Sequence, residues 1–202
     1  MSNIGKMTKA ERTKQFILEK AGPIYNVKGI NGTAIDDVLD AAKVTKGCLY
    51  NHFENKEDLS AQTADYLLKK IKDGTTRAMS KEKTAKGKIF AYMDFNRDPL
   101  NTYIEGGCPI FNMAVECDDN HSTIKKKVSA VAGLSHESFT QILQSGIENG
   151  EFSNALDPAV FAFKVFAAVE GGIVMCRVMN TNTPMKGLIK NLKQELEHYE
   201  IK

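Results

Sequence analysis

The amino-acid sequence predicts an all-α protein. Along most of the chain, apolar residues recur at the three- and four-residue spacing that places them on one face of a helix. No stretch shows the alternation of apolar and polar residues that a half-buried strand requires. Proline directly follows Asp157 and Thr183, whose side chains can cap a helix start, and proline in a first helical turn costs no hydrogen bond. These three observations favour helices joined by short turns.

About nine helices are expected. They span residues 9–27, 34–42, 46–53, 56–79, 84–97, 109–118, 122–149, 158–179 and 184–199. The first contains the pair Gly22-Pro23, where the proline removes a backbone hydrogen bond and is expected to kink or break the helix. Gly150 follows the longest periodic stretch and is suited to ending that helix.

The composition is that of a soluble globular protein. At 202 residues, with 42% apolar and 26% charged residues, the chain can bury a core in one large domain or two small ones. The formal charge of +2 is unevenly distributed. Six basic and two acidic residues lie between Met1 and Lys28, whereas the remainder has 21 basic and 23 acidic residues. This asymmetry indicates a basic face at the N-terminal end.

The sequence also favours a cytoplasmic location. The first residues, MSNIGKMTKAERTK, contain no apolar run that could act as a signal peptide. The most apolar later stretch, AVFAFKVFAAVEGGIVMC, is interrupted by Lys164 and Glu170, which argues against a membrane span. The cysteines lie far apart, without a CxxC pair, at Cys48, Cys108, Cys117 and Cys176. Free thiols in a reducing compartment are therefore expected.

The second and third helices form the most informative unit. Thr33 and Asp36 make a T-x-x-D start, in which the hydroxyl caps the helix and the carboxylate lies in its first turn. An inward apolar stripe follows at helical spacing: Ile35, Val38, Leu39 and Ala42. After a turn at 43–45, Leu49 and Phe53 point inward together, and Asn51 lies on the opposite face. Two short helices with a tight turn and a polar outer face predict a helix-turn-helix.

That outer face has the chemistry of a DNA contact surface. Lys46 lies at the start of the third helix, where its ammonium and the helix dipole favour phosphate or guanine acceptors. Gly47 allows close approach of the backbone, Tyr50 can donate to a phosphate, and Asn51 can pair with a base edge. The candidate DNA contacts are Thr33, Thr45, Lys46, Gly47, Cys48, Tyr50, Asn51, His52 and Lys56.

Simpler roles stay open for several of these residues. Thr33 can be only a helix cap, and His52 can be a hydrogen-bonded structural histidine. Lys56 can be a solvated lysine. Cys48 can be a small residue without redox chemistry.

The stretch TAIDDVLDAAKVTKGCLYNHFENKEDL, Thr33 to Leu59, resembles the DNA-binding signature of TetR/AcrR-type transcriptional repressors. This resemblance implies an all-α homodimer with a three-helix DNA-binding domain (1–55) and a larger effector-binding and dimerisation domain (56–202). It also implies that DNA contacts come mainly from the third helix and from Lys56. Lys43 stands where the family often has glycine, so a positive φ is expected at this non-glycine residue.

The last two helices are expected to form the dimer interface as a four-helix bundle across a two-fold axis. The eighth is apolar nearly all round, which indicates burial on more than one side. Its central pair Gly171-Gly172 costs about 1 kcal/mol per glycine relative to alanine, which close approach of another helix would offset. The predicted interface residues are Val165, Gly171, Gly172, Val174, Met175, Leu188 and Leu192. A plain intramolecular core is the alternative.

The effector site is less well defined. The stretch YIEGGCPIFNMAVEC, Tyr103 to Cys117, resembles the C-terminal domain of LmrA/YxaF-type repressors. The candidate pocket residues are Tyr66, Met93, Tyr103, Phe111, Asn112, Phe139 and Phe166, and each can equally be plain core. A small apolar or amphipathic effector is expected.

An enzyme is not expected. Glu195 and His198 fit half of a di-iron bundle motif whose second copy is missing, and no metal or cofactor site has familiar ligand spacing. The sequence therefore predicts a one-component transcriptional repressor that binds a near-palindromic operator as a dimer and is released by an effector. Two alternatives are a constitutive or architectural DNA-binding protein without an effector, and a bundle that mainly binds another protein.

Overall fold

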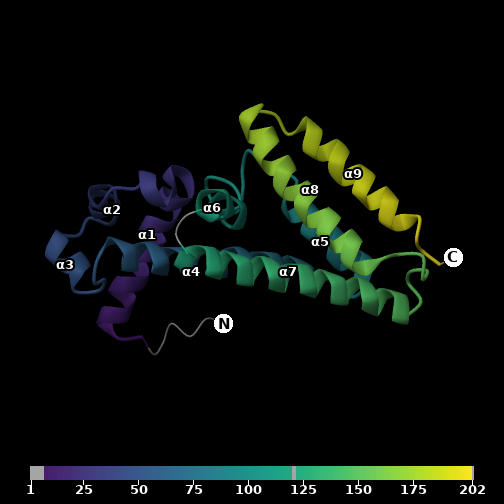
Figure 1. Ribbon diagram of the computed structural model, residues 1–202, viewed down its shortest axis with the longest axis horizontal. Coiled ribbons are helices and arrows are strands. Elements are labelled where there is room, and N and C mark those ends of the chain that lie inside the picture. The colour runs from purple at the N-terminus through teal and green to yellow at the C-terminus, as the bar shows by residue number, and fades with distance from the viewer. Residues whose placement is uncertain (1–6, 120–121, 202) are drawn as a thin grey trace. The chain divides into compact units, whose positions relative to one another are not determined.

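The computed structural model describes residues 7–119 and 122–201. Within these ranges the chain forms nine α-helices, and its only β-type pairing is an isolated antiparallel bridge between Phe152 and Glu200. The helices are α1 (Lys9–Gly32), α2 (Ile35–Ala42), α3 (Lys46–Tyr50), α4 (Lys56–Met79), α5 (Ala85–Phe95), α6 (Pro109–Cys117), α7 (Ser122–Glu148), α8 (Pro158–Val178) and α9 (Thr183–Glu197) (Figure 1). The predicted all-α class is confirmed.

The helix ends differ from prediction mainly in α1 and α3. The kink or break expected at Gly22-Pro23 is instead at Gly29: the backbone dihedrals stay helical through Pro23 and depart at Gly29, with φ +77° and ψ 173°. Proline normally clashes with the Cβ of the residue before it, and Gly22 has none. Gly29 adopts the positive φ because glycine reaches that region without steric cost. α3 stops at Tyr50, since the N–H groups of His52 and Phe53 both bond to the Leu49 carbonyl in a tight turn.

By packing, the described chain divides into two compact units, and the division differs from the predicted boundary between residues 55 and 56. The first unit contains the residues up to Lys70 together with those from Ile104 to Val128. The second contains Ile71–Tyr103 and the residues from Ser129 onward. The first unit therefore includes α6, α4 as far as Lys70 and α7 as far as Val128 in addition to the helix-turn-helix.

The first unit is held together by an apolar core and by an amide network between α1 and α6. Its largest fully buried side chains are Ile17, Leu49, Phe53, Leu59 and Leu67. The Asn112 amide donates to the backbone and side-chain oxygens of Asn26, both at 3.1 Å. The Asn26 amide in turn donates to the carbonyls of Glu105 (2.7 Å) and Gly107 (3.0 Å). These bonds join α6 and the segment before it to the middle of α1.

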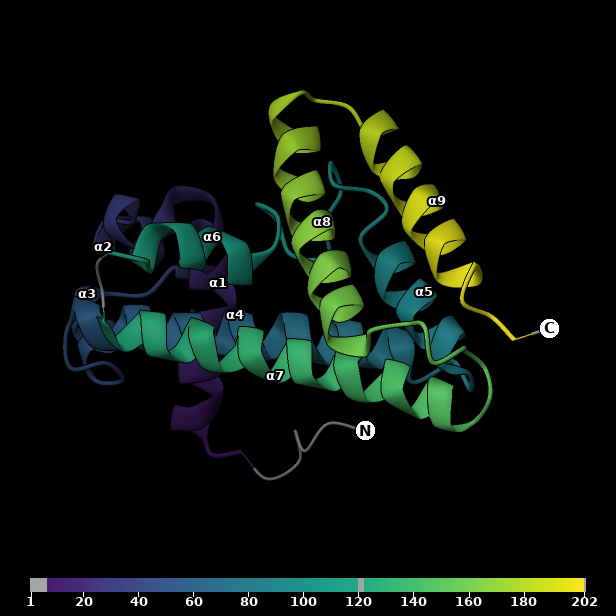
Figure 2. The ribbon, with the colours of Figure 1, turned by 45° about the vertical axis from the view of Figure 1, so that its right-hand side comes forward.

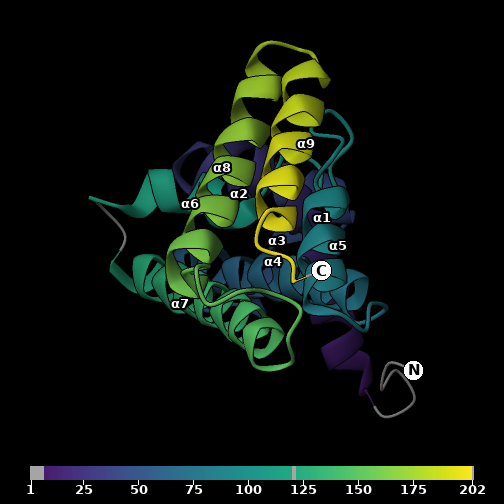
Figure 3. The same ribbon diagram turned by 90° about the vertical axis from the view of Figure 1, so that its right-hand side faces the viewer.

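In the second unit, α8 and α9 form an antiparallel pair with α5 beside α9 (Figures 2 and 3). The largest fully buried side chains here are Ile89, Met93, Leu143, Phe152, Ile173, Met185 and Leu196. Glu151 caps α5 from a distance, because its carboxylate accepts the N–H groups of Ala85 (3.0 Å) and Lys86 (3.2 Å). Gly172 lets α9 approach α8, since a Cβ there would be 2.9 Å from the side chains of Met185 and Leu188.

Candidate DNA interface

One face of α3 packs on the core of the first unit, and the opposite face is exposed. Leu49 and Phe53 are buried, and the Lys14 ammonium lies 5.4 Å from the centre of the Phe53 ring. Lys46 and Asn51 are exposed on the opposite face, together with Gly47 and Tyr50. A Cβ built on Gly47 would meet no atom within 4 Å, so this face is open at the position where a backbone can approach DNA most closely. The predicted inward and outward directions of α3 are confirmed.

The turn before α3 is specified by local hydrogen bonds. Lys43 adopts φ 54° and ψ 41°, the left-handed conformation predicted for this position, and its N–H donates to the Leu39 carbonyl. Thr45 is the N-cap of α3, and its hydroxyl oxygen accepts the Cys48 N–H at 3.2 Å. The Thr45 hydroxyl proton can still be donated outward, as a phosphate contact requires.

A reciprocal cap places Lys56 in the first turn of α4. The Asn55 side chain accepts the Asp58 N–H at 2.8 Å, and the Asp58 carboxylate accepts the Glu54 N–H at 3.1 Å. A hydrogen bond from the Gln62 side chain, followed by the one from the Glu54 N–H, lowers the pKa of Asp58 below its ordinary value. The ionised carboxylate therefore stabilises the helix start that carries Lys56.

Thr33 does not belong to the exposed surface, so its assignment as a DNA contact is corrected. Its side chain is 1% exposed, and its hydroxyl donates to the Gly29 carbonyl at 2.6 Å. Ala34 is the residue at the start of α2, and Asp37 accepts the Ala34 N–H at 3.0 Å. The predicted T-x-x-D cap is thus displaced by one residue, because the Thr33 hydroxyl is already used by the end of α1.

The other predicted contacts are Cys48, His52 and Lys56. Cys48 and His52 are half-buried in α3 and in the turn after it, and Lys56 is half-buried in the first turn of α4. The predicted contact residues thus offer the ammonium groups of Lys46 and Lys56, the hydroxyls of Thr45 and Tyr50, and the Asn51 amide. These groups suit phosphate and base-edge contacts. Among the described residues, no group of three or more histidine, cysteine or acidic side chains is placed to hold a metal ion.

The predicted effector residues are divided between the two units. Tyr66, Phe111 and Asn112 belong to the first unit, and Met93, Tyr103, Phe139 and Phe166 belong to the second. Met93 and Phe139 are buried, and the Phe139 ring lies 4.6 Å from that of Tyr92. Tyr103 is exposed and packs on Phe95, with ring centres 5.3 Å apart.

The predicted dimer residues are only partly available to a second copy. Val165 and Leu192 are 1% and 3% exposed within the unit, and Gly172 packs against α9, so their assignment to an interface is corrected. Gly171 has no atom within 4 Å of the position of a Cβ, and Met175 is exposed. Val174 and Leu188 are half-buried.

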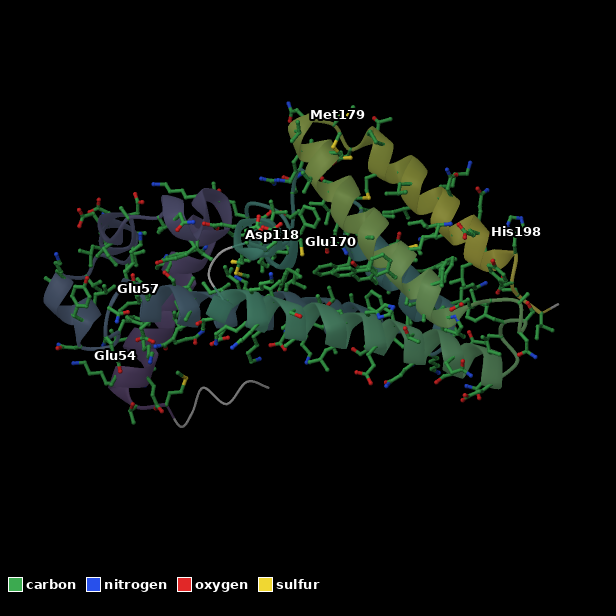
Figure 4. All side chains as sticks on the ribbon, viewed as in Figure 1. Glu54, Glu57, Asp118, Glu170, Met179 and His198 are labelled. Atoms are coloured by element: carbon green, nitrogen blue, oxygen red, sulfur yellow. The ribbon has the colours of Figure 1, made fainter. Side chains whose placement is uncertain are left out.

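α8 also carries a stripe of small and apolar residues on its open face. It consists of exposed Val160, Phe163, Ala167, Met175 and Val178 with half-buried Gly171, at successive spacings of three or four residues. Val178 is 77% exposed, and Figure 4 marks Met179 at the same end of α8. Helical periodicity alone could not select this stripe, since α8 is apolar nearly all round and only the packing of α9 shows which face remains open.

Both parts of the chain match known protein families. Residues 17–63 match the family described as "Bacterial regulatory proteins, tetR family". Residues 85–192 match "Tetracyclin repressor-like, C-terminal domain". Each of the two compact units contains matched residues.

Individual relatives are regulators as well. The HTH-type transcriptional repressor DhaR of Mycobacterium sp. (strain GP1) is 23% identical over 172 residues, which covers 85% of this chain and 86% of that protein. The HTH-type transcriptional regulator TtgR of Pseudomonas putida is 25% identical, covering 80% and 79%.

Two solved structures are similar over nearly their full length. A TetR-family transcriptional regulator from Cytophaga hutchinsonii is 31% identical, with a TM-score of 0.90 and coverage of 98% of this chain and 99% of that one. A TetR transcriptional regulator from Chloroflexus aurantiacus is 30% identical, with a TM-score of 0.91 and coverage of 96% and 98%.

Proposed function

Since this chain belongs to the TetR family of transcriptional regulators, we propose that it is a repressor that binds a near-palindromic operator as a dimer and leaves it when an effector binds. Proteins of this family regulate transcription and are not enzymes, bind DNA and are typically dimeric. The operator, the effector and the direction of regulation are the parts that the proposal adds.

The observation that carries the proposal is the open polar face of α3. Lys46, Tyr50 and Asn51 are exposed on a helix whose other face is fixed by buried Leu49 and Phe53. A recognition helix held in this way can enter a major groove with its first turn nearest the bases. We assign Asn51 to a base edge, and Lys46, Thr45 and Tyr50 to phosphates or to bases near them.

The exposed stripe on α8 supports dimerisation. Aromatic and aliphatic side chains at Phe163, Val160 and Val178 are unfavourable in water, and a second copy of α8 would cover them. Gly171 lies in the middle of the stripe and allows the two helices to approach closely. Two recognition helices in one dimer would then read half-sites about 34–36 Å apart, or a multiple of that distance.

The same stripe bears on whether α8 could span a membrane. By length and hydropathy alone, Pro158–Val178 would qualify as a membrane span, with 39% of its most apolar window buried. We propose that α8 instead pairs with its copy in a cytoplasmic protein, because one face already packs on α9 and the stripe is covered in the dimer.

Effector control rests on the predicted pocket residues and on family membership. We propose that a small apolar or amphipathic molecule binds near Met93, Phe139 and Phe166 and favours a dimer whose DNA-binding units no longer match the operator. To shift the protein between these two states, the effector must bind one of them more tightly than the other by a few kcal/mol.

The test is selection of bound sites from random duplex DNA at two salt concentrations, with Asn51→Ala as the matched variant. A palindromic motif bound with a Kd on the order of nanomolar is expected for the native chain. Weak, salt-sensitive binding without a motif would instead indicate the architectural alternative. A selected operator then serves as the probe for effectors, which are expected to lower its affinity.

A further inference from the structure

A cavity of about 500 Å³ lies within the first unit, beside the start of α4, and nothing proposed above uses it. Its lining comes from the end of α1, the start of α4 and the start of α7: Ile30, Asn31, Asn55, Lys56, Glu57, Asp58, Ser60, Ala61, Thr123 and Ile124. This volume is within the range of small-molecule sites. It is separate from the predicted effector residues and from the outer face of α3.

The buried part of the cavity lining is mainly apolar. Ile30 and Ile124 are almost fully buried, and Ala61 belongs to the same lining. The polar group at this depth is Ser60, whose hydroxyl donates to the Lys56 carbonyl at 2.7 Å and lies 3.1 Å from the Tyr25 hydroxyl. The Ser60 hydroxyl is therefore already hydrogen-bonded to the Lys56 carbonyl and the Tyr25 hydroxyl. An occupant need not supply a polar group here, so the buried lining suits a hydrocarbon.

The rim of the cavity carries a carboxylate available for pairing. Asp58 is engaged, since it accepts bonds from the Glu54 N–H and the Gln62 side chain. Glu57 is exposed, and within the described ranges no hydrogen bond or ion pair engages its carboxylate. Figure 4 labels Glu57 at the start of α4 and Glu54 in the turn before it. With Lys56 included, the charged groups of the lining sum to one negative charge, which favours a cation.

We propose that this cavity binds a small amphipathic amine. Its ammonium would pair with Glu57, and its hydrocarbon body would lie on Ile30, Ala61 and Ile124. The site goes beyond the proposed effector control because it belongs to the unit that contains the helix-turn-helix. Since Lys56 also lines it, the occupant's charge would lie beside a proposed phosphate contact.

The experiment uses the full chain without DNA and three six-carbon probes at neutral pH: n-hexylammonium, hexanol and hexanoate. Methyl NMR of isoleucine-labelled protein follows Ile30 and Ile124 directly, so binding elsewhere is recognised by other methyl groups such as that of Ile89. Saturable shifts at Ile30 and Ile124 are expected, with the amine about three- to fivefold tighter than hexanol and hexanoate weakest.

Two variants locate the site, and a third is their control. Ala61→Phe fills the cavity and is expected to abolish the shifts. Glu57→Gln, at an exposed position that should not affect folding, is expected to remove the preference for the amine over hexanol. Glu54→Gln removes the same charge from a neighbouring residue outside the cavity and should keep that preference. The proposal is overturned if Ile30 and Ile124 do not respond, if hexanoate binds as tightly as the amine, or if Glu57→Gln behaves like Glu54→Gln.

Discussion

Glu116 lies so close to Gly29 that a Cβ on this glycine would be 2.8 Å from the carboxylate oxygen Oε2. The reason is a bidentate cap: the two Glu116 oxygens accept the N–H groups of Ile30 and Asn31, each at 2.8 Å. The break at Gly29 exposes these N–H groups, and α6 supplies the acceptor. The last turn of α1, which leads directly to the helix-turn-helix, is therefore held by a residue far along the chain.

Gly29→Ala is expected to destabilise the first unit by about 2 kcal/mol or more. Alanine at a positive φ costs about 1–2 kcal/mol, and the added methyl group also displaces Glu116. Hydrogen exchange of the Ile30 and Asn31 amides measures the loss locally. Gly133→Ala is the control, because its Cβ would meet nothing within 4 Å in the middle of α7. The control should be neutral or stabilising by up to about 1 kcal/mol, and equal effects of the two changes would contradict this account.

Glu116→Ala removes the cap without straining the backbone. Two N–H groups lose their acceptor, which costs about 1–3 kcal/mol, and Glu116→Gln should be intermediate because it keeps one acceptor oxygen. Urea unfolding monitored by isoleucine methyl signals of the first unit provides the measurement. Glu105→Ala is the matched control, since Glu105 is exposed and contributes its backbone carbonyl to Asn26. An equal loss in the control would mean that the carboxylate does not act as a cap.

Lys56→Ala and Asn51→Ala should affect DNA binding in different ways. Loss of a phosphate contact at Lys56 should weaken all sequences evenly and lower the slope of log K against log salt by about one. Loss of a base contact at Asn51 should relax the preference at one operator position, by about 1–3 kcal/mol. Binding titrations at several salt concentrations separate the two effects. Thr33→Ser, which keeps the buried hydroxyl, should leave the affinity unchanged.

Phe163→Glu should dissociate the proposed dimer. A charge on the α8 stripe would be buried in the dimer without a partner, so the dimer Kd should rise about a hundredfold or more. Analytical ultracentrifugation across a concentration series measures this change. Val115→Glu introduces the same charge at an exposed apolar residue of α6, off the stripe, and should leave the dimer intact. A dimer that survives Phe163→Glu would place the interface elsewhere.

Acidification should loosen the start of α4 through Asp58. Hydrogen bonds from Gln62 and from the Glu54 N–H hold the pKa of Asp58 below its ordinary value of about 4. A carboxylate with a depressed folded-state pKa contributes stability above its unfolded pKa, and this contribution is lost as the pH falls through the folded pKa. Unfolding of the native chain below about pH 4 should therefore be steeper with pH than that of Asp58→Asn. Parallel curves for the two proteins would contradict the assignment.

The sequence by itself determined the local structure of this protein. The nine helices of the described residues, the helix-turn-helix, the positive φ of Lys43 and the outward face of α3 all follow from periodicity, caps and turn residues within a few positions of one another. Tertiary structure decided what depends on distant partners. Thr33 turned inward because the Gly29 carbonyl accepts its hydroxyl, and α6 joined the first unit through Asn112 and Glu116. On α8, which is apolar nearly all round, the packing of α9 rather than any pattern left one stripe free, since hydrophobic burial has no direction of its own.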